Sequence, residues 1–144
     1  MHKLFPLLLI VSIVTACSNS DKNREEENKK IIERVFEELI NQKKVENIEV
    51  YYIPDVVDHS AWPGQAPGRE GLKQAVTDFH KSYRDLEVKV DEVIATGNKV
   101  VTRETWKGVN NTTSKPVTGT VMHIFQLDNG KVTDEWSEGW EWLQ

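Results

Sequence analysis

The chain has 144 residues and a formal net charge of −5 at pH 7. Its length is that of a single domain. Its 18 basic side chains are interspersed with 23 acidic ones, which argues against a nucleic-acid partner because such proteins present a basic surface. The one cysteine has no partner for a disulfide within the chain.

The first 16 residues have the order of segments expected of a secretory signal peptide. Lys3 precedes an apolar run from Leu4 to Val14, which is followed by Thr15-Ala16. Basic, apolar and small segments in this order are typical of exported proteins. The apolar run is too short to span a bilayer, which takes about 20 helical residues. We therefore expect residues 1–16 to be removed.

The segment Val14-Thr15-Ala16-Cys17 resembles the lipobox of bacterial lipoproteins. The resemblance implies cleavage before Cys17 and attachment of lipid, such as palmitate, to this cysteine. Several acyl chains hold a protein stably on a membrane. The expected mature protein is therefore exported and anchored by lipid in the cell envelope. An ordinary signal peptide with an unmodified cysteine near the cut is the alternative.

Residues 17–29 are expected to form a disordered tether. From Ser18 to Lys30 the chain contains no apolar residue, so this segment cannot offset the entropy lost on ordering. The folded domain is expected to cover residues 30–144.

Three helices are expected in the first half of the domain. The first shows the helical apolar period at Ile32, Val35, Phe36, Leu39 and Ile40. A second, shorter helix is expected from Val45 to Tyr52, because Pro54 cannot continue it. The third is expected from Glu70 to Tyr83.

After Tyr83 the apolar period changes to two, which indicates β-strands. Leu86, Val88 and Val90 alternate with charged residues. Further strands are expected at 100–106, 117–127 and 132–142, with turns or loops at 96–99, 110–116 and 128–131. Helices followed by antiparallel strands predict an α+β domain with the helices on one face of the sheet.

The last of these strands contains the strongest candidate site residues. If 132–142 is extended throughout, Trp136, Glu138, Trp140 and Trp142 point to one face, and the tryptophans mark that face as the inner one. A carboxyl among apolar rings is desolvated and holds a proton near neutral pH, as a general acid must. The alternative is that Gly139 introduces a bulge that turns Glu138 to solvent.

Two histidines are further candidates. His59 lies near Trp62 in a loop and could act as a base or as a hydrogen-bond donor to a ligand; a structural or merely exposed histidine is the alternative. His123 lies on the apolar face of its strand with Val121 and Phe125, which favours a buried structural histidine over a ligand-binding one. No metal-ligand spacing or nucleotide motif is present, so we expect no metal and no cofactor, and any catalysis would be acid–base work.

Several short segments follow one another in a characteristic order and spacing. They are Asp58-His59, Gly68-Arg69-Glu70-Gly71, Gly97-Asn98-Lys99-Val100, Thr118-Gly119 and Gly130-Lys131-Val132, the last leading to Asp134 and Trp136. Together they resemble the SnoaL-like polyketide cyclase family of the NTF2-like superfamily. The resemblance implies a conical α+β fold, in which helices pack on a curved antiparallel sheet that encloses a pocket, and homodimers are common in the superfamily.

The resemblance also implies that characterised members close a ring without a metal, using an aspartate four residues after the tryptophan of the last strand. That position is Trp140 here, and the usual arginine of the preceding strand is Gln126. We therefore expect a lipid-anchored domain that binds a small, largely apolar or aromatic molecule. The alternatives are an acid–base enzyme of cyclase or isomerase type, with Glu138 and His59 as catalytic residues, and a protein-interaction module. The expected ligand-binding residues are Trp62, Trp106, His123, Trp136 and Trp140.

Overall fold

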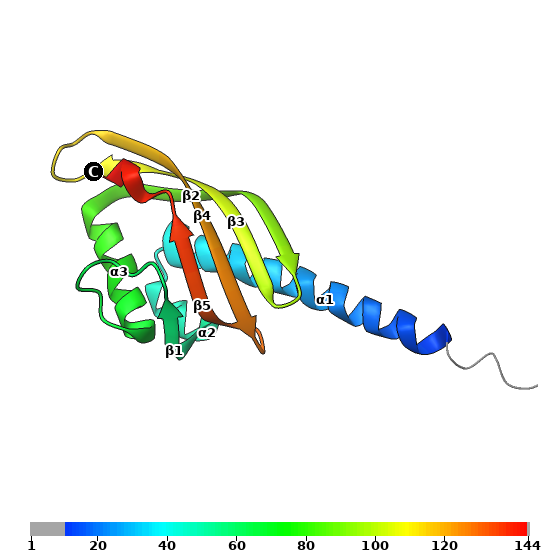
Figure 1. Cartoon of the computed structure of the whole chain (residues 1–144). Coiled ribbons are helices and arrows are strands. Elements are labelled where there is room, and N and C mark those ends of the chain that lie inside the picture. The colour runs from blue at the N-terminus through cyan, green and yellow to red at the C-terminus, as the bar shows by residue number, and fades with distance from the viewer. Residues whose placement is uncertain (1–10, 144) are drawn as a thin grey trace, which may run out of the picture.

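The computed structural model describes residues 11–143, and their side chains from 20 to 142. A five-stranded sheet curves around the helices, which lie on its concave face, and α1 projects beyond the sheet (Figure 1). The strand order is β1-β5-β4-β3-β2. The pairs β2–β3, β3–β4 and β4–β5 are antiparallel, and β1 pairs with β5 in parallel. This is the α+β architecture predicted from the sequence.

The three predicted helical regions are present. Helix α1 spans Val11–Val35 and continues as a π-helix, η1, over Phe36–Asn41. The second region consists of η2 (Val45–Asn47) and α2 (Ile48–Tyr51), and the third is α3 (Gly68–Ser82). Among residues 11–143, no helix is both long and apolar enough to cross a membrane.

Four of the five strands were predicted. These are β2 (Tyr83–Thr96), β3 (Lys99–Asn110), β4 (Pro116–Asp128) and β5 (Lys131–Glu138). The fifth, β1 (Tyr52–Asp58), was not predicted. Strand β5 also ends earlier than expected, because Gly139 adopts a positive φ of 104° and the chain then turns into the 3-10 helix η3 (Trp140–Leu143).

The segment expected to be a disordered tether is helical, because α1 runs through it. Its Glu, Lys and Arg residues favour helix, and Arg24–Asp21 and Lys29–Glu26 form ion pairs one turn apart. Glu25 accepts a hydrogen bond from the Gly97 backbone, so this part of α1 also contacts the β2–β3 turn. Residues 1–10 of the expected signal peptide and the side chain of Cys17 lie outside the described part of the chain.

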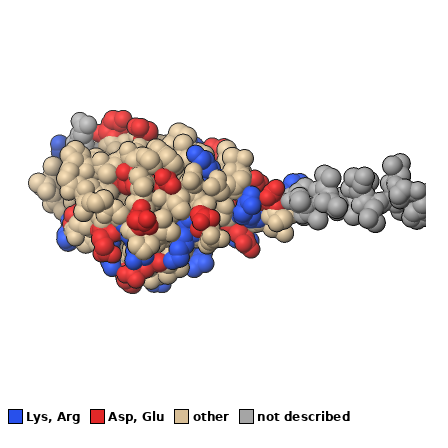
Figure 2. Space-filling view, turned by 60° about the horizontal axis from the view of Figure 1, so that its bottom comes forward, with Lys and Arg blue, Asp and Glu red and all other residues tan. Residues whose placement is uncertain are grey.

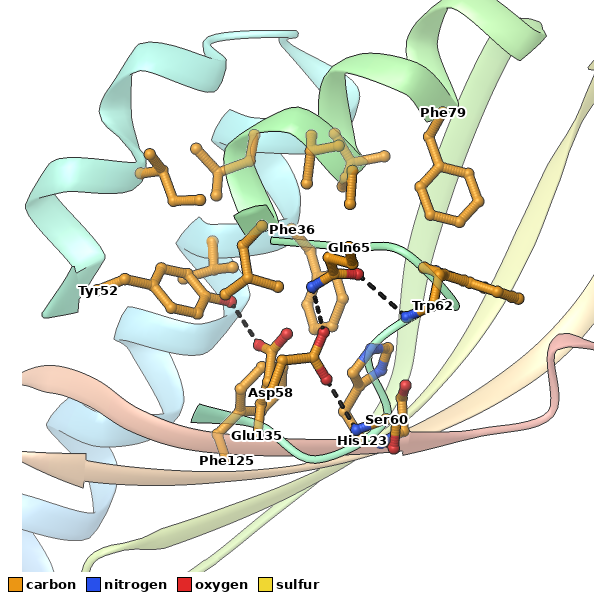
Figure 3. Close-up of a pocket in the computed structure, with 18 of the residues that line it drawn as sticks. Phe36, Tyr52, Asp58, Ser60, Trp62, Gln65, Phe79, His123, Phe125 and Glu135 are labelled. Carbon is orange, nitrogen blue, oxygen red and sulfur yellow. Dashed lines mark hydrogen bonds between the residues drawn. The ribbon is translucent and has the colours of Figure 1, made fainter. Parts of the chain in front are cut away.

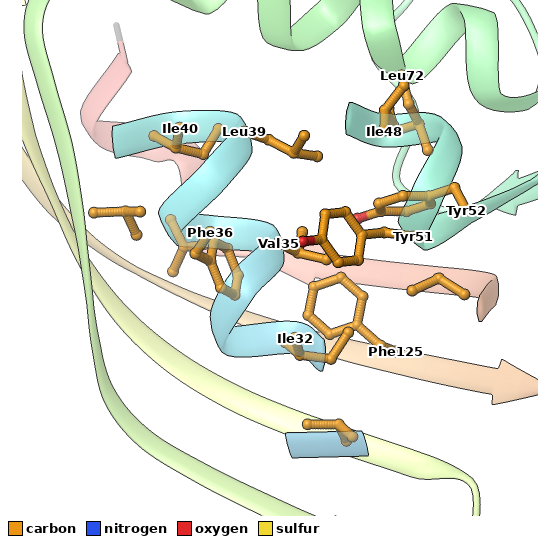
Figure 4. Packing of buried hydrophobic residues seen from close by; sticks show 14 of the residues in the cluster. Ile32, Val35, Phe36, Leu39, Ile40, Ile48, Tyr51, Tyr52, Leu72 and Phe125 are labelled. Carbon is orange, nitrogen blue, oxygen red and sulfur yellow. The ribbon is translucent and has the colours of Figure 1, made fainter. Parts of the chain in front are cut away.

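The hydrophobic core lies between the helices and the concave face of the sheet (Figure 4). Ile32, Phe36 and Leu39 project from α1 and η1 into this space, and Phe125 meets them from β4. Full burial of one such side chain is worth about 1.5–3 kcal/mol. On the face of the molecule shown in Figure 2, acidic and basic side chains are interspersed over the surface.

A β-bulge in β5 decides which side chains reach this interior. Leu127 pairs with Val132, but the next pair along the ladder is Gln126 with Asp134. Thr133 is therefore an additional residue on β5. Because side chains alternate between the two faces of a strand, one additional residue reverses the facing of every residue after it.

The facing predicted for β5 is wrong beyond Val132 for this reason. Glu135 and Ser137 point to the concave face, where they pair with Phe125 and His123 of β4. Glu138, which we expected on the inner face, is exposed. The bulge at Thr133, rather than one at Gly139, turns its carboxyl outward.

Candidate functional site

An internal cavity of about 90 Å³ lies between the concave face of the sheet, η1, α3 and the loop of residues 59–67, here called the Trp62 loop. Most of its lining is apolar. A few polar side chains converge on it, as is usual for small-molecule sites; Figure 3 shows how they lie. The polar lining residues are Tyr52, Asp58, Ser60, Gln65, His123, Glu135 and Ser137.

Glu135 is the buried acid among the residues that line this cavity. Its side chain is buried and accepts a 3.0 Å hydrogen bond from the Tyr52 hydroxyl (Figure 3). Burial raises the pKa of the Glu135 carboxyl to about 7; the nearby Asp58 carboxyl also raises it, while His123 and the Tyr52 hydrogen bond oppose the rise. A carboxyl that titrates near neutral pH can act either as an acid or as a base.

Asp58 ties the Trp62 loop to the sheet. Its Oδ2 accepts a 2.8 Å hydrogen bond from Gln65 Nε2, and its Oδ1 accepts one of 2.9 Å from the Ser60 backbone N–H. Gln65 Oε1 in turn accepts a hydrogen bond from the Trp62 backbone N–H, at 3.2 Å. The loop is thereby held over one side of the cavity (Figure 3).

His123 forms a second buried polar pair in the cavity wall. Its Nδ1 lies 3.0 Å from Oε2 of Glu104, a residue with no exposed surface. A carboxylate that accepts from Nδ1–H fixes the imidazole tautomer and leaves Nε2 for other partners. The other oxygen of the carboxyl, Glu104 Oε1, has no hydrogen-bond partner within the described part of the chain. The contact with Glu104 therefore fixes the orientation of the His123 ring in the cavity wall.

Trp140 occupies the centre of the aromatic part of the cavity. Its indole Nε1–H donates a 2.8 Å hydrogen bond to Ser137 Oγ, which fixes the ring. The rings around it are those of Trp106, Phe79, His123 and Trp62, at centroid distances of 5.3, 5.5, 5.7 and 6.0 Å. Of the five expected ligand-binding residues, the structure thus brings four together.

The fifth, Trp136, lies on the convex face of the sheet. The His59 ring stacks on it with centroids 4.3 Å apart, and His59 Nε2 lies 3.1 Å from Asp134 Oδ1. Because β5 is shifted by the bulge, neither His59 nor Glu138, the two expected catalytic residues, lines the cavity. Glu135 and Tyr52 line the cavity in place of His59 and Glu138.

Sequence reasoning missed Glu135 and Tyr52 as site residues. Glu135 was assigned to the outer face because strict alternation places it opposite Glu138, and Tyr52 was assigned to the end of a helix. The sequence carries no local signal of the shift, because Thr133 suits either face of a strand and the bulge arises from the pairing of β4 with β5. Among residues 11–143, no three His, Cys, Asp or Glu side chains gather closely enough to hold a metal ion.

Residues 30–139 match the family model described as SnoaL-like polyketide cyclase. The chain belongs to this family. No curated protein matches the sequence.

Solved structures share the fold. A candidate polyketide cyclase from Bacillus cereus is 25% identical, with a TM-score of 0.72, over 78% of this chain and 74% of that one. TsrD from Streptomyces laurentii is 18% identical, with a TM-score of 0.72, over 79% and 88% of the two chains. IdmH, a candidate polyketide cyclase from Streptomyces antibioticus, is 20% identical, with a TM-score of 0.70, over 78% and 91%.

Proposed function

We propose that the protein binds a small, neutral, largely apolar molecule in the cavity, with the polar group of the ligand at Glu135. The observation that carries the proposal is the burial of the Glu135 carboxyl, with a pKa of about 7, among apolar and aromatic side chains. No Lys or Arg is among the residues that line the cavity in the described part of the chain. An anionic ligand would therefore lack a counter-charge there.

The ligand group that fits is one that accepts a hydrogen bond, such as a carbonyl oxygen. Below pH 7 the protonated Glu135 carboxyl has a hydrogen to donate, while Tyr52 already donates its own to Glu135. The affinity for a ketone should therefore follow the protonated fraction of Glu135, because only that form is competent to donate.

The experiment is a titration with acetophenone at pH 6 and pH 8. The dissociation constant should be about tenfold higher at pH 8, because the competent fraction falls by about that factor. The Glu135→Gln variant keeps a donor that does not titrate, so its affinity should be the same at both pH values. Glu138→Gln, on the other face of the sheet, should behave as the unmodified protein. Equal pH dependence in the Glu135→Gln variant would contradict the proposal.

A second function is favoured by the same geometry and by the family: proton transfer at carbon without a cofactor. The ionised Glu135 carboxylate would take a proton from the carbon next to a ketone carbonyl. The C–H bond breaks, its electron pair moves into the enolate, and the reverse step returns a proton from Glu135 to carbon. The test is exchange of the methyl hydrogens of acetophenone for deuterium in D₂O, followed by proton NMR. Faster exchange that disappears in the Glu135→Gln variant would establish catalysis. If the unmodified protein does not accelerate the exchange, ligand binding is the only function that this cavity supports.

We further propose that a lipid on Cys17 holds the domain at the surface of a membrane in the cell envelope. The Val14-Thr15-Ala16-Cys17 segment supports this proposal. So does the course of α1, which extends away from the sheet toward Cys17 (Figure 1). An anchor at that end would leave the cavity and the Trp62 loop clear of the bilayer.

A further inference from the structure

A second hollow lies on the outer side of the Trp62 loop. This open groove, of about 490 Å³, runs between the loop and α3. Ala75 and Phe79 of α3, together with Trp62 and Gln65 of the loop, line both the groove and the inner cavity. These four side chains form a layer shared by the two spaces.

The size of the inner cavity limits what it can hold. Its volume of about 90 Å³ is smaller than the roughly 150 Å³ of an engineered cavity that accepts benzene in another protein. A ligand group of a few heavy atoms fits beside Glu135, but an aromatic ring does not fit with it. A larger ligand must extend past the layer that separates cavity and groove.

The geometry of this layer suits such a passage. The rings of Trp62 and Phe79 stand edge to face, with centroids 6.3 Å apart, and Trp62 is 41% exposed. The loop is fixed at its other end, where Gly71 of α3 lies so close to the Ala66 carbonyl that a Cβ would not fit. Near the tip, Gly64 has no atoms of other residues within 4 Å of where its Cβ would be. The loop is therefore tightly packed where it joins α3 and open around Gly64.

The charged residues that line the cavity and the groove restrict the ligand further. Neither the cavity nor the groove has a Lys or Arg among its described lining residues, whereas Asp58 and Glu135 line the cavity and Asp78 lines the groove. Hydrogen bonds from Gln74 and Lys81 lower the pKa of Asp78, so its carboxylate stays charged at neutral pH. Lys81 pairs with Asp78 at 3.1 Å, so the charge that disfavours an anionic head group is that of the two cavity acids.

We propose that the cavity and the groove are two compartments of one binding site, which takes a neutral, elongated molecule. Its small hydrogen-bonding head lies beside Glu135, and its flat apolar body lies in the groove against Trp62 and Phe79. This inference rests on the proposed function, because it assumes that Glu135 binds the head.

The test compares three neutral methyl ketones of increasing size, 2-butanone, acetophenone and 2-acetylnaphthalene, and the anion 2-naphthoate, by NMR shift titration. Gln74→Trp places a large side chain in the groove, because Gln74 lines the groove and not the cavity. Glu70→Trp is the matched control: Glu70 is also exposed on α3 but lines neither space.

In the unmodified protein and in Glu70→Trp, affinity should rise at least tenfold from 2-butanone to 2-acetylnaphthalene, and 2-naphthoate should bind at least tenfold more weakly than the ketone of the same ring system. In Gln74→Trp the rise should disappear, while 2-butanone binds as before. If Gln74→Trp binds 2-acetylnaphthalene as tightly as the unmodified protein does, or if 2-naphthoate binds equally well, the two-compartment site is wrong. Ketone binding that is indifferent to Glu135→Gln and to pH would instead contradict the proposed function.

Discussion

The Tyr52 hydroxyl donates a 3.0 Å hydrogen bond to Glu135 Oε2, which joins the first residue of β1 to the acid of the cavity. The two residues are 83 positions apart in the sequence and meet because β1 pairs in parallel with β5. Burial and the nearby Glu135 carboxyl raise the pKa of Tyr52 well above its ordinary value. Tyr52 thus remains a donor, and it holds the Glu135 carboxyl in place whether or not that carboxyl carries a proton.

The stability of the domain should fall as pH rises from about 4.5 to about 7. The pKa of Glu135 rises from 4.5 to about 7 on folding, so the folded state retains a proton that the unfolded state releases over this interval. Stability is therefore fully present below 4.5 and reduced above 7. The difference between the two pKa values corresponds to about 3 kcal/mol. Urea unfolding at pH 4.5, 6 and 8 measures it.

Glu135→Gln should remove this pH dependence and make the domain more stable than the unmodified protein at pH 8. The amide keeps an oxygen for the Tyr52 hydroxyl and carries no charge to desolvate. Glu138→Gln is the matched control, because its carboxyl is exposed on the opposite face of the sheet. If both variants retain the fall in stability above pH 4.5, the burial of Glu135 is not its source.

Tyr52→Phe should raise the pKa of Glu135 above about 7. The hydrogen bond from Tyr52 opposes the rise caused by burial, so its removal favours the protonated carboxyl. The free energy of unfolding should fall by about 1 kcal/mol, the usual contribution of one hydrogen bond. Carbon NMR titration of the variant checks the first effect and urea unfolding checks the second. A lower pKa for Glu135 in this variant would show that Tyr52 does not donate to it.

Much of the fold could be predicted because apolar periodicity reports burial directly. Ile32, Phe36 and Leu39 recur with the helical period and do face the sheet, and the alternation of Leu86 with Val88 does mark a strand. Strand β1 was missed because its central residues include Pro54 and Asp55, and its partner β5 lies far away in the sequence.

The site could be predicted only in part. Aromatic residues identified the cavity, since Trp62, Trp106 and Trp140 all line it. The acid could not be identified, because the bulge at Thr133 depends on how β4 and β5 pair rather than on a local pattern. Glu138 was preferred to Glu135 on a strict two-residue period, and one additional residue was enough to exchange their environments.

The two tryptophans that flank Glu138 should differ in their effects on replacement. Trp140→Ala removes a ring that contacts Trp106 and Phe79 in the cavity, and should cost about 3 kcal/mol of stability and weaken acetophenone binding. Trp136→Ala removes a stacking partner of His59 on the convex face; it should cost about 1 kcal/mol and leave binding unchanged. Thermal unfolding and ligand titration of both variants check this pair. A loss of binding in Trp136→Ala alone would place the ligand on the convex face.

Cys17→Ser should abolish lipid attachment to the protein. The expectation depends on the Val14-Thr15-Ala16-Cys17 segment and on the need of a lipoprotein for a thiol at this position. Metabolic labelling with a fatty acid in bacterial cells that express the full chain provides the measurement, and Ser18→Ala serves as a control that should remain labelled. Equal labelling of the Cys17→Ser variant would contradict the proposed anchor.

The most direct test of the account is a carbon NMR titration of the glutamate carboxyls, with the Glu135 signal assigned through Glu135→Gln and followed with and without acetophenone. In the free protein, the Glu135 carboxyl should titrate near pH 7. In the complex its pKa should be higher still, because the ketone accepts a hydrogen bond from the protonated form. A Glu135 carboxyl that titrates near 4.5, or one that acetophenone leaves unchanged, would contradict the claim that this residue is the ligand-binding acid of the cavity.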